Sequence, residues 1–383
     1  MLTYSLLAEQ VPGTSRDIDW PALLGFIPAL QALGDTPQDV RHHAEGDVLT
    51  HTRMVCDTLV AMPAYQAAPV ERKFVLFYAA LLHDLAKPPC TVTQPDGSIT
   101  SAGHSRRGAV DARLLLWRAG VPFSLREAIC QIIRVHQMPF FAVFGDKSGA
   151  TPEYLIRKLS WEVEMDALTT VAEADMRGRI CPGGDLALLA IDAFREMAEQ
   201  EHCLQGPRAF PDAATRMRYF ATQGAVSADH AIYPVAGSKV IVLSGPPASG
   251  KDTWAAQHAP DLPMLSYDDA REALGVRHGS KAAGKAVHWV VDQAKALLRD
   301  QAPFVWNATH LSQQMRRKTL DLLYRYHAEV TLVYLEAPEA LLLKRNALRD
   351  STLTNKELTA LLWHWGPPLQ SEAHHLAQVV NLS

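Results

Sequence analysis

The chain has 383 residues, enough for two or three domains, and its 48% apolar and 20% charged residues are typical of a folded globular protein. The net charge of -4 excludes a polycation that binds nucleic acid over its whole surface, so any nucleic acid must be held by local basic patches. Five scattered cysteines without a CxxC pair exclude a disulfide framework and a zinc ribbon.

The first twenty residues lack a basic flank before their short apolar stretch and make a poor signal peptide. No apolar run in the chain approaches the 18 residues of a membrane helix. We therefore expect a cytoplasmic protein that does not contact a membrane.

The first half of the chain is predicted to be helical, without clear strand alternation. Three segments have recognisable boundaries: residues 74–87, which stop at two prolines; residues 124–136, opened by a capping box of Ser124 and Glu127; and a long segment from Thr151 toward Arg179, which starts with an N-cap and a proline.

Six histidines and aspartates follow one another along this helical half, and they are His51, His83, Asp84, His104, His136 and Asp175. The adjacent pair His83 and Asp84 closes an apolar helix, where ionisable groups are costly to bury unless they are paired or bind a metal. Imidazoles and carboxylates together suit Mn, Fe, Co, Ni or Zn. For each histidine taken alone, the alternative is an ordinary core or helix-surface residue. His42 and His43 are assigned to a solvated or substrate-facing loop.

These residues resemble the HD phosphohydrolase superfamily, whose fold is all-α and whose metals hydrolyse phosphoesters. The resemblance implies a first metal site of His51, His83, Asp84 and Asp175, and a second of Asp84, His104 and His136, with Asp84 shared. Lys87 and Arg179, each one helical turn after a ligand, are expected to neutralise the substrate phosphate. The stretches HHAEGDVLTHT and AALLHDLAKP also resemble the HD domain of bacterial CCA-adding enzymes, which acts on RNA ends.

Prolines and glycines between residues 205 and 238 indicate a connector, which we expect to contain one short helix. Four short β-rich segments follow, each with a helix-length segment behind it, and they are KVIVLS, PMLS, FVWN and EVTLVYL. This alternation predicts a parallel α/β sheet. The predicted architecture is therefore multidomain: an all-α HD-type domain at 1–205, a connector at 206–237 and an α/β P-loop domain at 238–383. The first 237 residues carry a net charge of −6 and the remainder +2.

The first predicted strand runs into GPPASGKDT, a G-x-x-x-x-G-K motif at the junction of a strand and a helix. Such a loop turns backbone N–H groups toward phosphates, so we expect it to bind ATP or another NTP with Mg²⁺. The residues expected to contribute are Gly245, Ser249, Gly250, Lys251, Asp252 and Thr253. Asp252 stands where a serine or threonine is usual, and it can hold the metal directly or through water.

The second strand is followed by Asp268, Asp269 and Arg271. A carboxylate at the end of a parallel strand faces the ligand crevice, where Asp268 can accept a proton from an attacking hydroxyl and Arg271 can hold an acceptor phosphate. The alternative for Asp268 is a helix N-cap. Asn307 ends the third strand, where many P-loop proteins have an acid. The segment 344–349, KRNALR, is either a lid that brings Arg349 to the phosphoryl group or a solvated basic face.

This half resembles the polynucleotide 5′-kinase branch of P-loop phosphotransferases. The resemblance implies that Asp268 deprotonates the 5′-hydroxyl, that Asp269 and Arg271 bind the acceptor and that Arg349 is the lid arginine. Both halves together resemble the bacterial end-healing family called HD-Pnk, which implies repair of RNA or DNA ends ahead of a polynucleotide ligase. Arg106–Arg107 and residues 316–318 are candidate backbone contacts or, alternatively, a solvated surface.

Three other hypotheses remain open. One is an HD nucleotidase fused to a kinase of a small molecule or nucleoside. Another is a signalling hydrolase whose P-loop senses an NTP. The third is a non-catalytic interaction protein.

Overall fold

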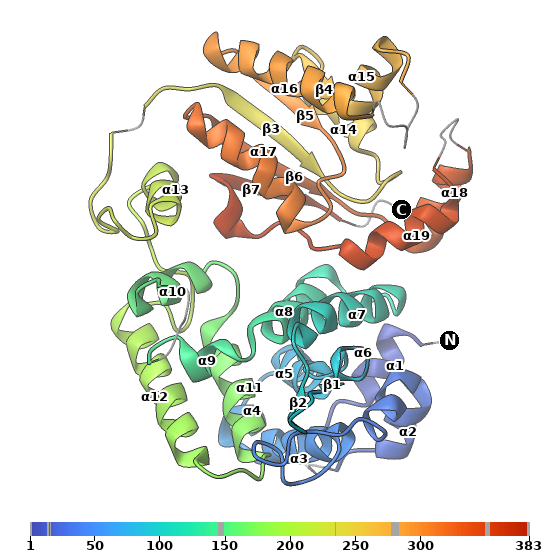
Figure 1. Cartoon of the computed structure of the whole chain (residues 1–383), viewed down its shortest axis with the longest axis vertical. Coiled ribbons are helices and arrows are strands. Elements are labelled where there is room, and N and C mark those ends of the chain that lie inside the picture. Colours follow the sequence, from blue (N-terminus) through green and yellow to red (C-terminus); the bar gives the residue numbers. More distant parts are fainter. Residues whose placement is uncertain are drawn as a thin grey trace. The chain divides into compact units, whose positions relative to one another are not determined.

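A computed structural model of the protein describes residues 2–13, 15, 17–144, 149–233, 235–276, 283–348 and 353–380. The chain divides into two compact units, Met1–Ala209 and Phe210–Ser383 (Figure 1). Among the described helices, none combines the length and the apolar character needed to cross a lipid bilayer.

The first unit is built almost entirely of helices. In chain order they are α1 (Tyr4–Glu9), α2 (Trp20–Phe26), the 3₁₀ helix η1 (Pro28–Leu33), α3 (Val48–Ala61), α4 (Pro63–Gln66), α5 (Val70–Leu82), α6 (Lys87–Cys90), α7 (His104–Arg118), α8 (Phe123–Val135), α9 (Met138–Phe141), α10 (Pro152–Leu159), α11 (Met165–Arg177) and α12 (Gly184–Gln200). A short antiparallel hairpin of β1 (Val92–Thr93) and β2 (Ile99–Thr100) lies between α6 and α7, in a half where no strand was predicted.

The central helix of this unit is α5, and α3, α8 and α11 all contact it. Every residue from Phe74 to Leu82 is buried, which explains why this helix is apolar on all sides. The helix ends at Leu82, five residues before the predicted end, and Lys87 opens the separate short helix α6. The chain therefore leaves the helix immediately before His83 and Asp84.

The capping box predicted at the start of α8 is wrong. Pro122 is the N-cap of α8, and no side chain caps it. Glu127 is instead engaged by two buried arginines, because Arg113 Nη2 and Arg126 Nε donate to its carboxylate at 2.9 and 2.8 Å. Thr151 is confirmed as an N-cap, although the helix it opens ends at Leu159 and a second helix, α11, completes the predicted segment.

The second unit is an α/β domain. Its elements are α13 (Ala213–Ala221), β3 (Lys239–Ser244), α14 (Lys251–His258), β4 (Met264–Ser266), α15 (Tyr267–Ala273), α16 (Ala283–Arg299), β5 (Phe304–Asn307), α17 (Gln313–Arg325), β6 (Glu329–Leu335), α18 (Glu339–Leu348), α19 (Asn355–Leu361), the 3₁₀ helices η2 (Leu362–His364) and η3 (Gln370–Glu372), and β7 (His375–Val379). The strands form one parallel sheet in the order β4-β5-β3-β6-β7. The four predicted strands are confirmed, and β7 is an additional strand at the edge.

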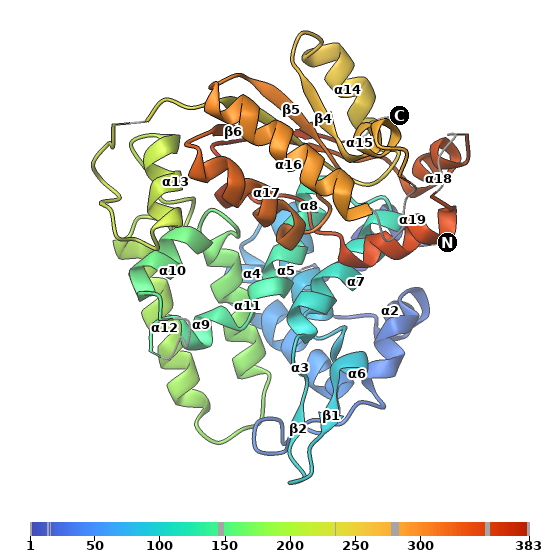
Figure 2. The same ribbon diagram turned by 45° about the horizontal axis from the view of Figure 1, so that its top comes forward.

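Helices cover both faces of this sheet (Figure 2). Val240 and Val242 pack in one cluster with side chains of α16 and α17, whereas Leu243 packs on the opposite face with Ala255 of α14. This alternation follows from the period of two in a strand, and burial on both faces explains why the central strands are almost wholly apolar.

The segment expected to be a connector contains α13, and this helix is tied to the end of the chain. Arg216 donates from Nη2 to the carbonyls of Ala373 and His374 at 2.7 and 2.8 Å. The helix thus belongs to the second compact unit, which begins at Phe210.

Candidate functional site

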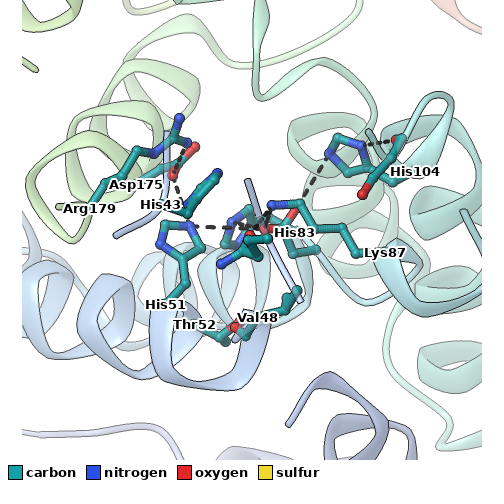
Figure 3. Close-up of polar contacts among 12 residues, drawn as sticks. His43, Val48, His51, Thr52, His83, Lys87, His104, Asp175 and Arg179 are labelled. Carbon is teal, nitrogen blue, oxygen red and sulfur yellow. Dashed lines mark hydrogen bonds and ion pairs between the residues drawn. The ribbon is translucent and has the colours of Figure 1, made fainter. Parts of the chain in front are cut away.

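Each unit contains one candidate site, and the site of the first unit is a buried cluster of histidines and aspartates. The six residues singled out in the sequence all lie within it and are all buried: His51 in α3, His83 and Asp84 directly after α5, His104 at the start of α7, His136 directly after α8 and Asp175 in the last turn of α11. Five separate elements therefore contribute to one centre (Figure 3).

Asp84 lies between the histidines. Its Oδ2 atom is 3.2 Å from Nε2 of His83 and 3.9 Å from Nε2 of His51, and its Oδ1 atom is 3.3 Å from Nε2 of His104. Nε2 of His51 is also 3.1 Å from Oδ1 of Asp175. The carboxylate of Asp84 thus faces imidazoles on both sides.

Backbone carbonyls orient three of the imidazoles. Nδ1 of His83, His104 and His136 each lies 2.7–2.8 Å from the backbone carbonyl three residues before it. A carbonyl can only accept, so Nδ1 carries a proton, and in the neutral imidazole Nε2 then has the lone pair that a metal requires. Metal-binding histidines in proteins are oriented in this way.

The arrangement fits divalent metal ions. Three groups of candidate ligand atoms in the described chain each lie within 4.8 Å of one another. Two consist of residues singled out in the sequence, His51, His83 and Asp175 in one and Asp84, His104 and His136 in the other, and the third is His43, Glu45 and His51. The Nε2 atoms of His51 and His83 are fully buried and have no hydrogen bond of adequate geometry, although carboxylate oxygens lie nearby. Unsatisfied buried nitrogens are costly, and coordination to a cation satisfies them.

The electrostatics of the cluster also favour a cation. Burial lowers the pKa of His136 to about 3 and also lowers the pKa of His104, so both imidazoles stay neutral. Burial acts the same way on His83, but the charges of Asp84 and Asp175 outweigh it and raise its pKa. Burial opposes ionisation of the two aspartates, yet neighbouring cationic groups keep their pKa values well below the usual value. The two carboxylates therefore require positive charge beside them.

Lys87 and Arg179 lie beside these carboxylates, one on each side of the cluster (Figure 3). Lys87 Nζ is 2.8 Å from Oδ2 of Asp84 and donates to Oε1 of Gln38 at 2.6 Å. Arg179 Nη2 donates to Oδ1 of Asp175 at 2.6 Å. Both cations thus lie directly against carboxylates of the cluster.

The sequence analysis missed Glu45. Its side chain is almost fully buried, and its Oε1 atom is 2.9 Å from Nδ1 of His43 and 2.9 Å from Nδ1 of His51. Its Oε2 atom accepts from the backbone N–H of Ile180 at 2.9 Å. The solvated alternative for His43 is wrong, because the ring is buried against His51, while a substrate-facing role for this residue stays a prediction. The one sequence signal was the H-x-E spacing in HHAEGD, upstream of His51.

The site of the second unit is the phosphate-binding loop between β3 and α14. Gly245 and Gly250 both have positive φ, at 145° and 100°, and the carbonyl of Leu335 occupies the space of a side chain at Gly245. Lys251 Nζ donates to the loop carbonyls of Gly245 and Pro246 at 3.1 and 2.8 Å. Ser249 Oγ is buried in the same loop and has no hydrogen-bond partner among the described residues.

A hollow of about 590 Å³ adjoins this loop. Gly250, Asp252 and Thr253 line it on the loop side, and Trp254 and Arg345 are among its other lining residues. The loop therefore opens onto a space large enough for a nucleotide.

The predicted acceptor residues lie in the first turns of α15. Ser266 is the N-cap of this helix, since its Oγ accepts from the backbone N–H of Asp268 at 3.1 Å and of Asp269 at 3.3 Å. The N-cap alternative for Asp268 is thus wrong, and its side chain, 79% exposed, forms an ion pair with Arg271. Burial raises the pKa of Asp269, with further contributions from Asp268 and Asp252.

Two groups of basic residues gave different outcomes. Arg349 lies outside the described residues, while Arg345, from the same KRNALR segment, reaches the hollow. Arg316 is buried, with its Nε and Nη2 atoms donating to Glu372 at 2.8 Å each, so its assignment as a backbone contact for nucleic acid is wrong. Arg107 donates to Asp111 at 2.9 Å on the surface of α7.

Comparison with known proteins supports the assignment of the second unit. A family described as "AAA domain" matches residues 240–363. The multifunctional CCA protein of Methylococcus capsulatus is 30% identical over 237 residues, which are 57% of this chain and 51% of that protein. That of Ralstonia nicotianae is 34% identical over 171 residues, 42% of this chain and 35% of that protein. The chain spans about half or less of the length of these curated relatives.

Among solved structures, a candidate kinase from Chloroflexus aurantiacus has a TM-score of 0.32 and 19% identity, covering 37% of this chain and 88% of that one. The matched family, the strand–loop–helix with its lysine and the parallel sheet agree with one another. The second unit is thus an α/β domain with a phosphate-binding loop, and most of it matches the family described as "AAA domain".

Proposed function

We propose that the protein is a bifunctional enzyme that heals broken nucleic-acid ends. The first unit hydrolyses 2′,3′-cyclic phosphate and 2′- or 3′-phosphate ends, and the second transfers the γ-phosphate of an NTP to a 5′-hydroxyl. The observation that carries the proposal is that one chain contains, in two compact units, a buried histidine–aspartate cluster that could hold metal ions and a phosphate-binding loop. The similarity to multifunctional CCA proteins supports a role at nucleic-acid ends.

In the kinase reaction, Lys251 leaves the loop carbonyls for the β- and γ-phosphates of the donor. Asp268 accepts the proton of the 5′-hydroxyl as its oxygen attacks the γ-phosphorus, and the nucleoside diphosphate departs. Arg271, already paired with Asp268, is placed to hold a phosphate of the acceptor strand. The exposure of Asp268 suits this role, because a polynucleotide end must reach it from solvent.

In the phosphoesterase reaction, His51, His83, Asp84, His104, His136 and Asp175 would hold one or two divalent metal ions. Such ions polarise a phosphoryl oxygen and supply hydroxide at neutral pH. Lys87 and Arg179 neutralise the non-bridging oxygens of the substrate. Together the two reactions leave a 3′-hydroxyl and a 5′-phosphate, the ends that a polynucleotide ligase joins.

One experiment tests both activities. The protein is incubated with γ-labelled ATP, Mg²⁺ and a 5′-hydroxyl oligonucleotide, and in parallel with Mn²⁺ and an RNA that ends in a 2′,3′-cyclic phosphate. We expect label transfer in the first reaction and conversion of the 3′ end in the second, with RNA and DNA substrates compared in each. No transfer together with an unaltered 3′ end would refute the proposal.

Two variants test whether the centres are independent. Asp268→Ala should remove only the first reaction, and Asp84→Ala only the second. A single substitution that removed both would show that the centres do not act separately. Transfer to a nucleoside but not to an oligonucleotide would favour a small-molecule kinase instead.

A further inference from the structure

Two positions beside the phosphate-binding loop carry other side chains than is usual in P-loop proteins. There, Mg²⁺ is held by the hydroxyl that follows the loop lysine and by an aspartate at the end of a neighbouring strand. In this chain the carboxylate follows the lysine, as Asp252, and a neutral amide, Asn307, ends strand β5. The negative charge has therefore moved from the sheet to the first turn of α14.

The structure joins the two residues directly. Asn307 Nδ2 donates to Oδ1 of Asp252 at 2.6 Å. Asn307 is buried, and its backbone is held between two strands, because it pairs with Leu243 of β3 and with Ser266 of β4. A donor fixed in this way sets the orientation of the carboxylate that it contacts.

The residues fit a hard divalent cation. Mg²⁺ binds oxygen ligands, and P-loop sites use one or two protein oxygens together with the phosphates of the nucleotide. The carboxylate of Asp252 supplies such an oxygen beside the loop, and the buried hydroxyl of Ser249, which has no hydrogen-bond partner among the described residues, is available to a polar ligand.

We propose that Asp252 is the carboxylate that holds the nucleotide-bound divalent cation, and that Asn307 is the residue that positions it. This inference rests on the proposed binding of an NTP by the loop. It has a consequence for affinity. A carboxylate next to a polyphosphate repels it, whereas a cation between them converts the repulsion into attraction. Nucleotide binding should therefore depend on the cation more steeply than it does with a neutral hydroxyl at this position.

The test measures binding and not turnover. ADP is titrated into the full chain by calorimetry, once with Mg²⁺ and once with EDTA, and the ratio of the two dissociation constants is compared between variants. We expect this ratio to fall at least about tenfold in Asp252→Ser and in the nearly isosteric Asp252→Asn, with tighter binding in EDTA and weaker binding with Mg²⁺. Asp321→Asn, which removes a surface carboxylate of α17, should leave the ratio unchanged.

The role of Asn307 is tested by restoring the usual arrangement. Asn307→Leu should lower the ratio, and the double variant Asp252→Ser with Asn307→Asp should recover it, because the carboxylate returns to the strand end. If position 307 affected only the folding of the protein, the double variant would not recover the ratio of the two dissociation constants. Thermal melts of each variant in EDTA identify any that are unfolded.

The outcomes separate this inference from the proposed function. An unchanged ratio in folded Asp252→Asn overturns the inference, as does an equal fall in Asp321→Asn. Wild-type protein that binds ADP with the expected ratio but labels no 5′-hydroxyl end supports the inference and refutes the kinase proposal. Failure of the wild type to bind ADP with Mg²⁺ overturns both.

Discussion

The residues of the histidine–aspartate cluster are at most 6% exposed, whereas the side chain of Asp268 in the second unit is 79% exposed. In the cluster, backbone carbonyls orient His83, His104 and His136, and Glu45 lies beside His51, in the absence of any ligand. In the second unit, Lys251 bonds to its own loop and Asp268 to Arg271, so both would have to change partners in the proposed reaction. A metal centre requires ligands that are preorganised and dry. A phosphotransfer site must instead admit two large anions.

The contrast between the buried cluster and the exposed site depends most on Asp268, the proposed general base. We expect Asp268→Asn to lower 5′ phosphorylation by about 10²- to 10⁴-fold, the usual contribution of a general base. Its metal content and 3′-end hydrolysis should stay at wild-type levels. Asp269→Asn is the matched control, expected to act mainly on the KM of the acceptor. A larger loss of kcat in Asp269→Asn than in Asp268→Asn would transfer the role to its neighbour.

Acid should lower the free energy of unfolding of the second unit through His310, a buried residue with no role in the proposed reaction. Burial lowers the pKa of His310 to about 4; its Nδ1 donates to the carbonyl of Leu243, and its Nε2 accepts from Thr319. The unfolded chain binds this proton near pH 6.5, so between pH 6.5 and 4 the unfolded state binds more protons. The contribution of neutral His310 to the free energy of unfolding is fully present above pH 6.5, and the free energy of unfolding falls by about 3 kcal/mol toward pH 4.

Urea unfolding at several pH values measures this dependence. The unfolding transition of the second unit is the one that ADP shifts to higher urea concentration. His310→Gln should be less stable at neutral pH but flatter in its response to acid. A variant as steep as the wild type would assign the dependence to other groups, such as His374.

The cluster should be sensitive to the distance between α3 and α11. A Cβ at Gly178, directly after α11, would lie 2.6 Å from the backbone nitrogen of Val55 in α3. Gly178→Ala should therefore lower the free energy of unfolding of the first unit by about 1–3 kcal/mol and reduce bound metal, because His51 and Asp175 move apart. Gly25→Ala, in a helix with free space, is the control; an equal loss there would remove the steric explanation.

The smallest expected effect concerns the carboxylate behind His51. Glu45→Gln keeps the size of the side chain but loses the charge that pairs with Nδ1 of His51 and His43. We expect metal affinity to weaken by about 10- to 100-fold, as for other residues that orient metal ligands. Equilibrium dialysis against Mn²⁺ measures this, with Glu71→Gln on the surface of α5 as control. Unchanged affinity would show that the helices alone orient His51.

Much of this architecture was predictable because its signals are local. The four apolar strands follow from β-rich runs buried on both faces, and β7 was missed because its sequence, HLAQV, belongs to an edge strand with largely exposed side chains. The capping box failed because Glu127 satisfies buried arginines from another helix. A local motif cannot register a partner brought in by tertiary packing.

In the candidate sites, too, residues with a local sequence pattern were predicted, and residues whose role depends on distant contacts were not. The order of the six histidines and aspartates was visible, and the structure brings all of them together. Glu45 was not found, because its role depends on contacts with Ile180, 135 residues away. Arg316 looked like a surface cation in the run RRK, yet its guanidinium is buried against Glu372, 56 residues further on.

The phosphate loop is held by contacts with later parts of the chain, and this affects the order in which the two units fold during synthesis. Gly245 donates its N–H to the carbonyl of Thr309 at 2.8 Å and lies against the carbonyl of Leu335, so the loop is shaped by chain synthesised much later. At 5–20 residues per second, translation reaches Leu335 roughly 5–20 s after Gly245. By then every residue of the first unit has long been synthesised. During synthesis the histidine–aspartate cluster can therefore assemble first, and the phosphate loop takes its final shape only after Leu335 has been added.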